Sequence, residues 1–226
     1  MAETASTGLE IVRQQLREEI ANSISHGIAA IFAVIGLVLL LRHATMFQDV
    51  WQAVGFSLYG GSLTLVFVSS TIYHAVQHPP LKRVFRILDH CAIFLLIAGT
   101  YTPFTIVIIR GTWGWFFFCL IWVASLSGVV LKIGYMDQFQ RASKWIYLGM
   151  GWFGLVALYP LFEVFSSSGI LWLFVGGMLY TVGVVFYVWE KLPFNHFIWH
   201  LFVMAGALCH FMAVYNHISP ADVLPM

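Results

Sequence analysis

Charged side chains are scarce in this sequence. Asp, Glu, Lys and Arg make up 9% of its 226 residues, against roughly 25% in a soluble domain. Hydrophobic residues make up 60%, and the mean hydropathy is +0.85. So few polar side chains cannot cover the surface of a water-soluble fold, and the solvent must therefore be lipid. The net charge of +1 also gives no basis for binding nucleic acid or a strongly acidic partner.

Cysteine is rare as well, with three residues in the chain. Cys91, Cys119 and Cys209 all lie in apolar runs and form no CxxC pair. An odd number also leaves one thiol unpaired in any disulfide scheme. We expect these cysteines to be buried thiols without a chemical role.

Long apolar runs fill most of the chain, and a helix needs about 20 such residues to cross a bilayer. Seven runs of this kind occur, at about 24–41, 53–76, 88–109, 113–131, 145–163, 169–188 and 195–216. They predict an all-α integral membrane protein, a seven-transmembrane helix bundle over 23–217, with a cytoplasmic segment at 1–22 and a short extracytoplasmic tail at 218–226. The first run is a retained span, because Arg42 and His43 rather than a small-residue cleavage site follow it.

The basic residues predict which loops face the cytoplasm, where Lys and Arg are enriched. Arg42 and Arg110 alone lie on the opposite side. The other nine of the eleven lie before the first run or in the two–three, four–five and six–seven loops: Arg13, Arg17, Lys82, Arg83, Arg86, Lys132, Arg141, Lys144 and Lys191. We therefore expect a multi-pass protein of the cell (inner) membrane with its N-terminus cytoplasmic and its C-terminus outside.

Apolar residues before the first run recur at helical spacing among polar ones: Leu9, Val12, Leu16 and Ile20. The pattern predicts a short amphipathic helix on the inner membrane surface. A solvated helical tail is the alternative.

Ionisable groups inside spans are costly and usually functional, so their depth matters. With this orientation, Ser70 and His74 lie in the last inner turns of the second span. Asp89 lies in the first turn of the third span, and His196 and His200 lie in the first two turns of the seventh. Three histidines and one carboxylate are thus predicted at one level of the inner leaflet.

His196 and His200 are spaced i,i+4, which places both imidazoles on one helix face about 6 Å apart along the axis. A helix uses this spacing to offer two nitrogen ligands to one metal ion. With His74 they would leave a fourth tetrahedral position open for water, as in catalytic zinc sites. Asp89 then either hydrogen-bonds that water or binds the metal directly, and Ser70 lies one turn deeper on the face of His74.

A zinc-free polar network or a proton relay is the alternative explanation for these three histidines. The remaining histidines are expected to be interfacial or hydrogen-bonded to a neighbouring helix. This group comprises His43 and His78 near loops and His210 and His217 in the last span. His90 is not expected to be a ligand, because consecutive residues such as Asp89 and His90 do not share a helix face.

Three stretches, SSTIYHAVQHP, RILDHCAIFLLIAGTYTPF and HFIWHLFVMAGALCHFMAV, resemble signature segments of the haemolysin III family. That family is similar to the adiponectin and progestin receptors and, more remotely, to alkaline ceramidases. The N-terminal NSISHG, with Asn22 and His26, matches as well, so the resemblance covers about residues 18–217.

The resemblance implies a seven-helix bundle with its N-terminus inside. It also implies zinc held by His74, His196 and His200, with Asp89 contacting the zinc-bound water and Ser70 as the motif serine. We do not expect the long cytoplasmic N-terminal domain of the animal receptors here, so the resemblance does not extend to their hormone signalling.

Three functions are weighed on this basis. The first is a zinc-dependent hydrolase of a lipid amide or ester in the inner leaflet, whose reaction class rests on the distant ceramidase likeness. In it Asp89 is the general base, and Ser70 orients the water or donates to the oxyanion. The second is a non-enzymatic membrane sensor or regulator with a structural zinc site. The third is a haemolysin-type pore-former, for which no span has the polar stripe. Membrane lipids are the expected partners, and the sequence names no protein partner.

Overall fold

The computed structural model describes residues 2–157 and 159–218, which are almost entirely helical and contain no strand. In chain order the elements are α1 (Ala2–Phe47), α2 (Val50–Ala75), α3 (Pro79–Pro103), the π-helix η1 (Phe104–Ile109), α4 (Gly111–Ala157), α5 (Leu161–Val164), α6 (Ser167–Val188) and α7 (Asn195–His217). The prediction of an all-α fold is confirmed. Six helices in the described part of the chain are long and apolar enough to cross a membrane.

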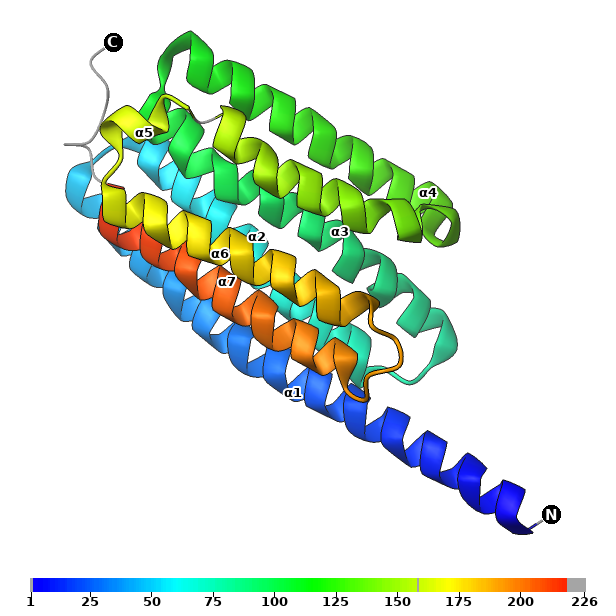
Figure 1. Ribbon diagram of the computed structural model, residues 1–226. Coiled ribbons are helices and arrows are strands. Elements are labelled where there is room, and N and C mark those ends of the chain that lie inside the picture. The colour runs from blue at the N-terminus through cyan, green and yellow to red at the C-terminus, as the bar shows by residue number, and fades with distance from the viewer. Residues whose placement is uncertain (1, 158, 219–226) are drawn as a thin grey trace.

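The difference from the seven predicted spans arises in α4. Its 47 residues would make a helix of about 70 Å, more than twice the roughly 30 Å of a hydrocarbon core. Its helical geometry is interrupted at Tyr135, where φ is −138° and ψ is 45°. Figure 1 shows the chain reversing direction within α4, so that its two legs run antiparallel. The predicted fourth and fifth spans therefore fall on the two legs of one element.

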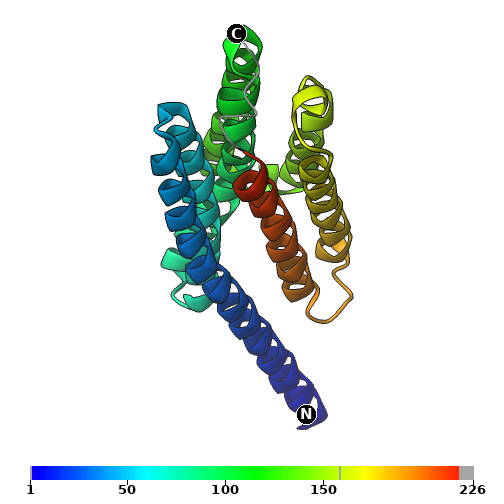
Figure 2. The same ribbon diagram turned by 90° about the vertical axis from the view of Figure 1, so that its left-hand side faces the viewer.

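The helices pack in an order that leaves one side of the bundle open. α1 packs on α2 and α7, α2 packs on α3, α3 packs on α4, and α6 packs on α7. Figure 2 shows α7 lying between α1 and α6. α4 and α6, at the two ends of this order, meet much less, and a cavity described below lies between them.

The turn between the predicted third and fourth spans lies at Arg110, as expected. Arg110 has a positive φ of 47°, and its guanidinium pairs with the Asp49 carboxylate. The other oxygen of Asp49 caps α2 by accepting from the backbone N–H of Trp51 at 2.8 Å. One carboxylate thus ties the start of α2 to the end of η1.

Three local predictions differ from the structure. No break separates the expected surface helix from the first span, because α1 is continuous and Val12, Leu16 and Ile20 are exposed along it. α3 begins at Pro79 rather than near residue 88, since proline suits the first helical turn, and Asp89 therefore lies in its third turn. The helix of the predicted fifth span ends at Ala157. The side chain of Leu9 and the tail at 219–226 lie outside the described residues.

The cysteines follow the prediction in part. Cys91 and Cys209 are buried and unbridged, whereas Cys119 is exposed. In a water-soluble protein an apolar run predicts burial. In a membrane protein it does not, because hydrophobic side chains also cover the lipid-facing outside of the bundle.

Candidate metal centre

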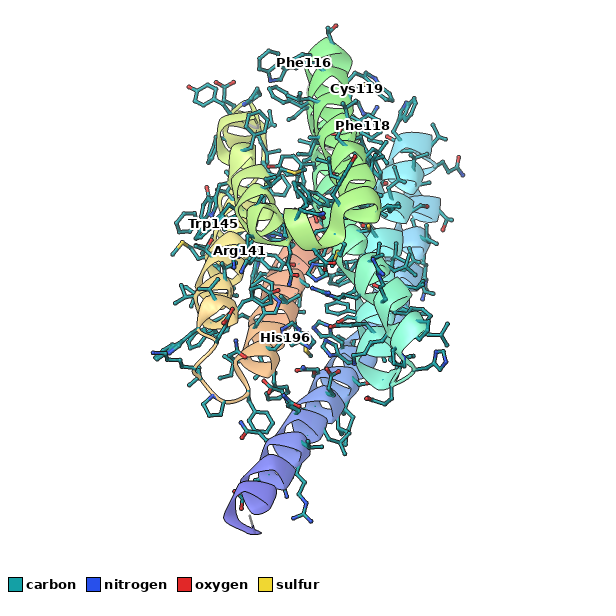
Figure 3. All side chains as sticks on the ribbon, turned by 90° about the vertical axis from the view of Figure 1, so that its right-hand side faces the viewer. Phe116, Phe118, Cys119, Arg141, Trp145 and His196 are labelled. Carbon is teal, nitrogen blue, oxygen red and sulfur yellow. The ribbon has the colours of Figure 1, made fainter. Side chains whose placement is uncertain are left out.

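Helices α2 and α7 bring three histidines together near the end of the bundle from which the N-terminal part of α1 emerges, where Figure 3 labels His196. His74 lies in the last turn of α2, and His196 and His200 lie in the first two turns of α7. One ring nitrogen from each lies within 4.8 Å of the others. The His196 and His200 ring centroids are 4.7 Å apart, and His74 lies 5.1 and 5.0 Å from them. These three side chains could hold one metal ion.

The hydrogen bonding of the cluster fits a metal. His74 and His200 are 4% and 2% exposed, and within the described residues His74 Nε2 and His200 Nδ1 have no hydrogen-bond partner. A buried polar atom without a partner costs about 1–3 kcal/mol, which a bound cation would offset. Tetrahedral zinc with Zn–N bonds of about 2.0–2.1 Å needs nitrogens roughly 3.4 Å apart, so small side-chain rotations suffice. The residues present therefore fit zinc in type and spacing.

The carboxylate of Glu19, in α1, contacts His74 on the side of its ring that faces away from the cluster. His74 Nδ1 lies 2.9 Å from Glu19 Oε2, and the Lys82 ammonium donates to the same oxygen at 3.0 Å. Metal-binding histidines usually donate their second N–H to a carboxylate, which fixes the tautomer and the ring orientation. With Nδ1 as the donor, His74 Nε2 presents its lone pair to the cluster.

A fourth histidine, also from α1, supports His200. The rings of His26 and His200 stack with centroids 3.5 Å apart and planes 10° from parallel. His26 is 3% exposed, and it also packs edge-on against Phe67. The His26 ring therefore restricts the orientation of His200, although its own nitrogens are not part of the three-histidine group.

Sequence reasoning missed Glu19 altogether, and it placed His26 at the entrance of the first span and in a family motif but not beside His200. The signal was present, because Glu19, Asn22 and His26 are spaced i, i+3 and i+7 and so share one helix face. It went unused because this stretch was assigned to a surface helix and a span entrance. In the folded chain the same face packs against α2 and α7.

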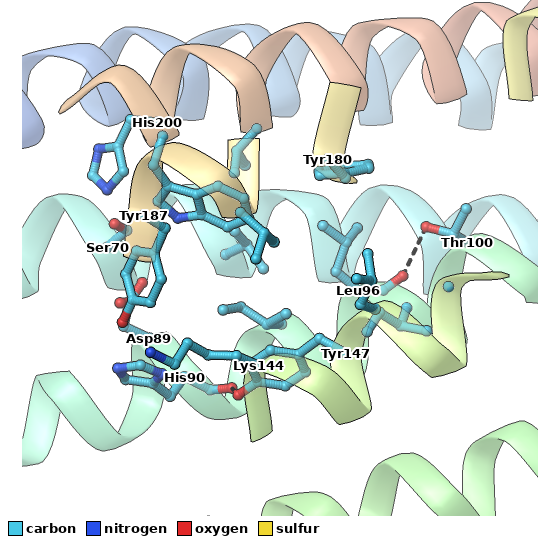
Figure 4. Close-up of a pocket in the computed structure, with 18 of the residues that line it drawn as sticks. Ser70, Asp89, His90, Leu96, Thr100, Lys144, Tyr147, Tyr180, Tyr187 and His200 are labelled. Atoms are coloured by element: carbon cyan, nitrogen blue, oxygen red, sulfur yellow. Dashed lines mark hydrogen bonds between the residues drawn. The ribbon is translucent and has the colours of Figure 1, made fainter. Parts of the chain in front are cut away.

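Asp89 and Ser70 lie beside the histidines rather than among them. The side chains of Asp89 and Ser70 line one cavity (Figure 4), together with His196 and His200. Asp89 does not belong to the group of ligand atoms within 4.8 Å of one another. The arrangement is thus three ring nitrogens with a carboxylate and a hydroxyl at the cavity wall.

The cavity has a volume of about 980 Å³, at the upper end of the roughly 300–1,000 Å³ of small-molecule sites. It follows α3 and the first residue of η1, from Asp89 to Phe104, a distance of about 22 Å along the helix. The other walls are formed by α2, the second leg of α4, α5, α6 and α7, with His26 of α1. Away from Asp89 the lining is mainly apolar, with Leu96, Phe162 and Leu173 among its residues. Figure 4 shows Leu96, Thr100 and Tyr180 at this end, apart from Ser70, Asp89 and His200.

The remaining histidines have other roles. His210 Nε2 lies 3.2 Å from the Leu173 carbonyl oxygen, and His217 Nδ1 lies 2.7 Å from Ser166 Oγ. The prediction that they serve packing and hydrogen bonding is confirmed. His90 lines the cavity without joining the three-histidine group.

Comparison with known proteins gives a consistent result over nearly the whole chain. The sequence model of a family described as "Haemolysin-III related" matches residues 14–211. The chain is 44% identical over 207 residues to "Hemolysin-3" of Bacillus cereus, covering 92% of this chain and 94% of that protein. It is 42% identical over 199 residues to "Hemolysin-3 homolog" of Bacillus subtilis (strain 168), covering 88% and 93%. Over 217 residues it is 28% identical to "Monocyte to macrophage differentiation factor" of Homo sapiens, covering 92% and 88%.

Proposed function

This chain belongs to the haemolysin III family, and on that premise we propose that it is a zinc-dependent hydrolase of a lipid amide or ester in the inner leaflet. The cavity is the main support for this proposal. Ser70, Asp89, His196 and His200 line the same cavity of about 980 Å³ as a long series of apolar side chains. A structural metal site ties helices together and is usually closed by four protein ligands, so it needs no such space.

His74, His196 and His200 would hold the zinc ion. When bound, zinc supplies a Lewis acid for a carbonyl and lowers the pKa of water to about 7. The Asp89 carboxylate accepts the proton of the attacking water. The Ser70 hydroxyl, which lines the same end of the cavity as Asp89, donates either to that carboxylate or to the developing oxyanion. The apolar lining holds the acyl chain and keeps bulk water from the reacting carbonyl.

Two other functions have less support. A membrane sensor with a structural zinc site accounts for the histidines but leaves the cavity without a role. A haemolysin-type pore requires polar groups along its whole length. Beyond Thr100 and Tyr101 the cavity lining is largely apolar, with Phe104, Leu161 and Phe162.

The test of the hydrolase is a lipid assay with the purified protein. Ceramides, acyl amides and phospholipids are incubated with and without a chelator, and the products are identified by mass spectrometry. We expect free fatty acid to appear, to vanish with chelator and to return when zinc is added. If no lipid is cleaved although the protein is fully loaded with zinc, the sensor is the better proposal.

We also propose that the chain crosses the membrane seven times. The break at Tyr135 divides α4 into two legs, and each leg is long enough for one crossing. In Figure 1 the α2–α3 turn, the α4 reversal and the α6–α7 loop lie at the end where α1 protrudes, and the other turns lie at the opposite end. Most of the basic residues belong to the segments at the first of these ends, which supports a cytoplasmic N-terminus.

Seven spans predict opposite locations for two reporter fusions. A reporter after Met226 should be extracytoplasmic, and one after Lys191, in the α6–α7 loop, should be cytoplasmic. The basic residues motivate this result, because nine of eleven belong to the N-terminal side. Alkaline phosphatase and fluorescent-protein fusions report the two sides. A cytoplasmic signal from the fusion after Met226 would mean that a span has been miscounted.

Glu19 should affect metal affinity without touching the metal. Loss of a carboxylate behind a histidine ligand typically costs 10–100-fold in affinity, and we expect Glu19→Ala to lower zinc affinity by about this factor. Glu19→Gln keeps an oxygen acceptor for His74 Nδ1, so its zinc affinity should lie between those of the unmutated protein and Glu19→Ala. Competition with a chromophoric chelator measures the affinities. Glu10→Gln, an exposed carboxylate on the same helix, is the control and should bind zinc normally. An unchanged affinity in Glu19→Ala would show that His74 needs no such support.

A further inference from the structure

The inner end of the cavity is rich in positive charge. Lys82, Arg83 and Arg86 of α3 line it together with Lys144 of α4. The carboxylates in the same lining are Asp89 and Asp137. Four cationic side chains therefore meet two anionic ones at the end of the cavity that also holds the histidines.

Two of these cations have partners in the protein. Lys82 donates to Glu19, and Arg86 pairs with Asp137 and with the Gln140 amide. Within the described residues no ion pair involves Lys144 or Arg83. The Lys144 ammonium lies over the Tyr187 ring, 5.1 Å from its centroid, and Figure 4 places Lys144 near Asp89, His90 and Tyr147 at the cavity wall.

Basic residues are enriched in cytoplasmic loops, which explains why this side of the protein is positively charged. It does not explain why four of the cations line the cavity. Arg141 and Lys191 belong to the same predicted side of the membrane, yet neither lines the cavity. Arg141 is only three residues from Lys144 and is exposed. The cations that line the cavity are thus a subset of the basic residues on this side.

The rest of the cavity selects for a long apolar group. Its course along α3 and into η1, from Asp89 to Phe104, is about 22 Å, whereas one leaflet of the hydrocarbon core is about 15 Å thick. An acyl chain can therefore lie in it at full length. A ligand that uses both ends must be an amphiphile with an anionic head.

We propose that the cavity binds a lipid with an anionic phosphate headgroup. Its phosphate lies against Lys144, Arg83 and Arg86, because guanidinium and ammonium groups are the side chains that bind phosphate most strongly. Its acyl chain lies along α3, which leaves the carbonyl between head and chain at the level of Asp89 and Ser70. The inference rests on the proposed function in that such a lipid is then its substrate.

Binding can be separated from catalysis with ether-linked lipids, which contain no hydrolysable carbonyl. The purified protein in neutral detergent is mixed with equal amounts of ether-linked phosphatidic acid, phosphatidylcholine and diacylglycerol with identical chains. Native mass spectrometry counts the lipid retained by each protein molecule. We expect phosphatidic acid to dominate. Lys144→Gln should lower its affinity about tenfold, the usual worth of a hydrogen bond to a charged group. Arg141→Gln is the matched control and should bind as the unmutated protein does.

Glycerol 3-phosphate separates the headgroup from the chain and should compete only weakly. Equal retention of phosphatidic acid and diacylglycerol would overturn the inference, as would equal losses in Lys144→Gln and Arg141→Gln. Competition by glycerol 3-phosphate as strong as that of the lipid would refute the role of the chain. Arg83→Gln, at an exposed position, replaces Lys144→Gln if that variant has a lower unfolding temperature. Selective binding without hydrolysis of any ester-linked lipid would refute the proposed function alone, and hydrolysis of neutral lipids without selective binding would refute this inference alone.

Discussion

Replacing His196 by alanine should remove most of the metal from the purified protein. His74 and His200 would remain, but two imidazoles hold an ion far more weakly than three. Zn–N bonds of about 2.0–2.1 Å leave no distance over which a more remote side chain could substitute. His26 is stacked face to face on His200 and does not belong to the group of mutually close ligand atoms, so we do not expect it to replace His196. Elemental analysis of the purified variant gives the metal content per chain, for which we expect about one zinc in the unmutated protein.

His43→Ala and His217→Ala serve as controls for this loss. His43 packs near Phe56 and Tyr215, and His217 lies beside Ser166 at the end of α7. Both variants should keep their metal. Equal metal loss in all three variants, or normal metal content in His196→Ala, would refute the proposed site.

Asp89→Asn should keep the metal and lose the activity. The three histidines hold the ion without Asp89, and an amide cannot accept the proton of a water molecule at neutral pH. Hydrolysis should therefore fall by about 10²–10⁴-fold, the usual worth of a general base. Metal content and initial rates are measured on the same preparation. Because asparagine is nearly isosteric with aspartate, a change in packing does not account for the loss.

The opposite pair of results would identify Asp89 as a fourth ligand. In a closed structural site the same substitution weakens metal binding and lowers the unfolding temperature together, because the free energy of metal binding contributes to folding. In the structure Asp89 lies outside the group of mutually close ligand atoms. This separation favours the first outcome, in which the metal is kept and the activity is lost. Ser70→Ala is a useful companion, since it leaves both the carboxylate and the histidines in place.

The grouping of the histidines could be predicted because it depends on two simple rules. Helical spacing puts His196 and His200 on one face, and the alternation of spans puts the end of α2 at the level of the start of α7. Both rules concern single helices and their order, which the sequence contains directly.

The contacts that Glu19 and His26 make with the histidine ligands could not be predicted from the sequence, because they depend on how the helices pack. The carboxylate of Glu19 meets His74 only because α1 lies against α2 and α7. The cavity exists because α4 and α6 hardly meet, and no local pattern encodes the absence of a contact. The exposure of Cys119 was mispredicted for a related reason, since apolar residues in a membrane protein face lipid as readily as they face a core.

The continuity of α1 makes the spacing between two of its residues a fixed length. Glu19 supports His74 and His26 supports His200, and one uninterrupted helix carries both. One residue inserted between them would turn the preceding part of the helix by about 100° and shift it by about 1.5 Å. Glu19 would then face away from His74 while His26 stayed in place. This short stretch should therefore tolerate changes of side chain on its lipid face far better than any change in its length.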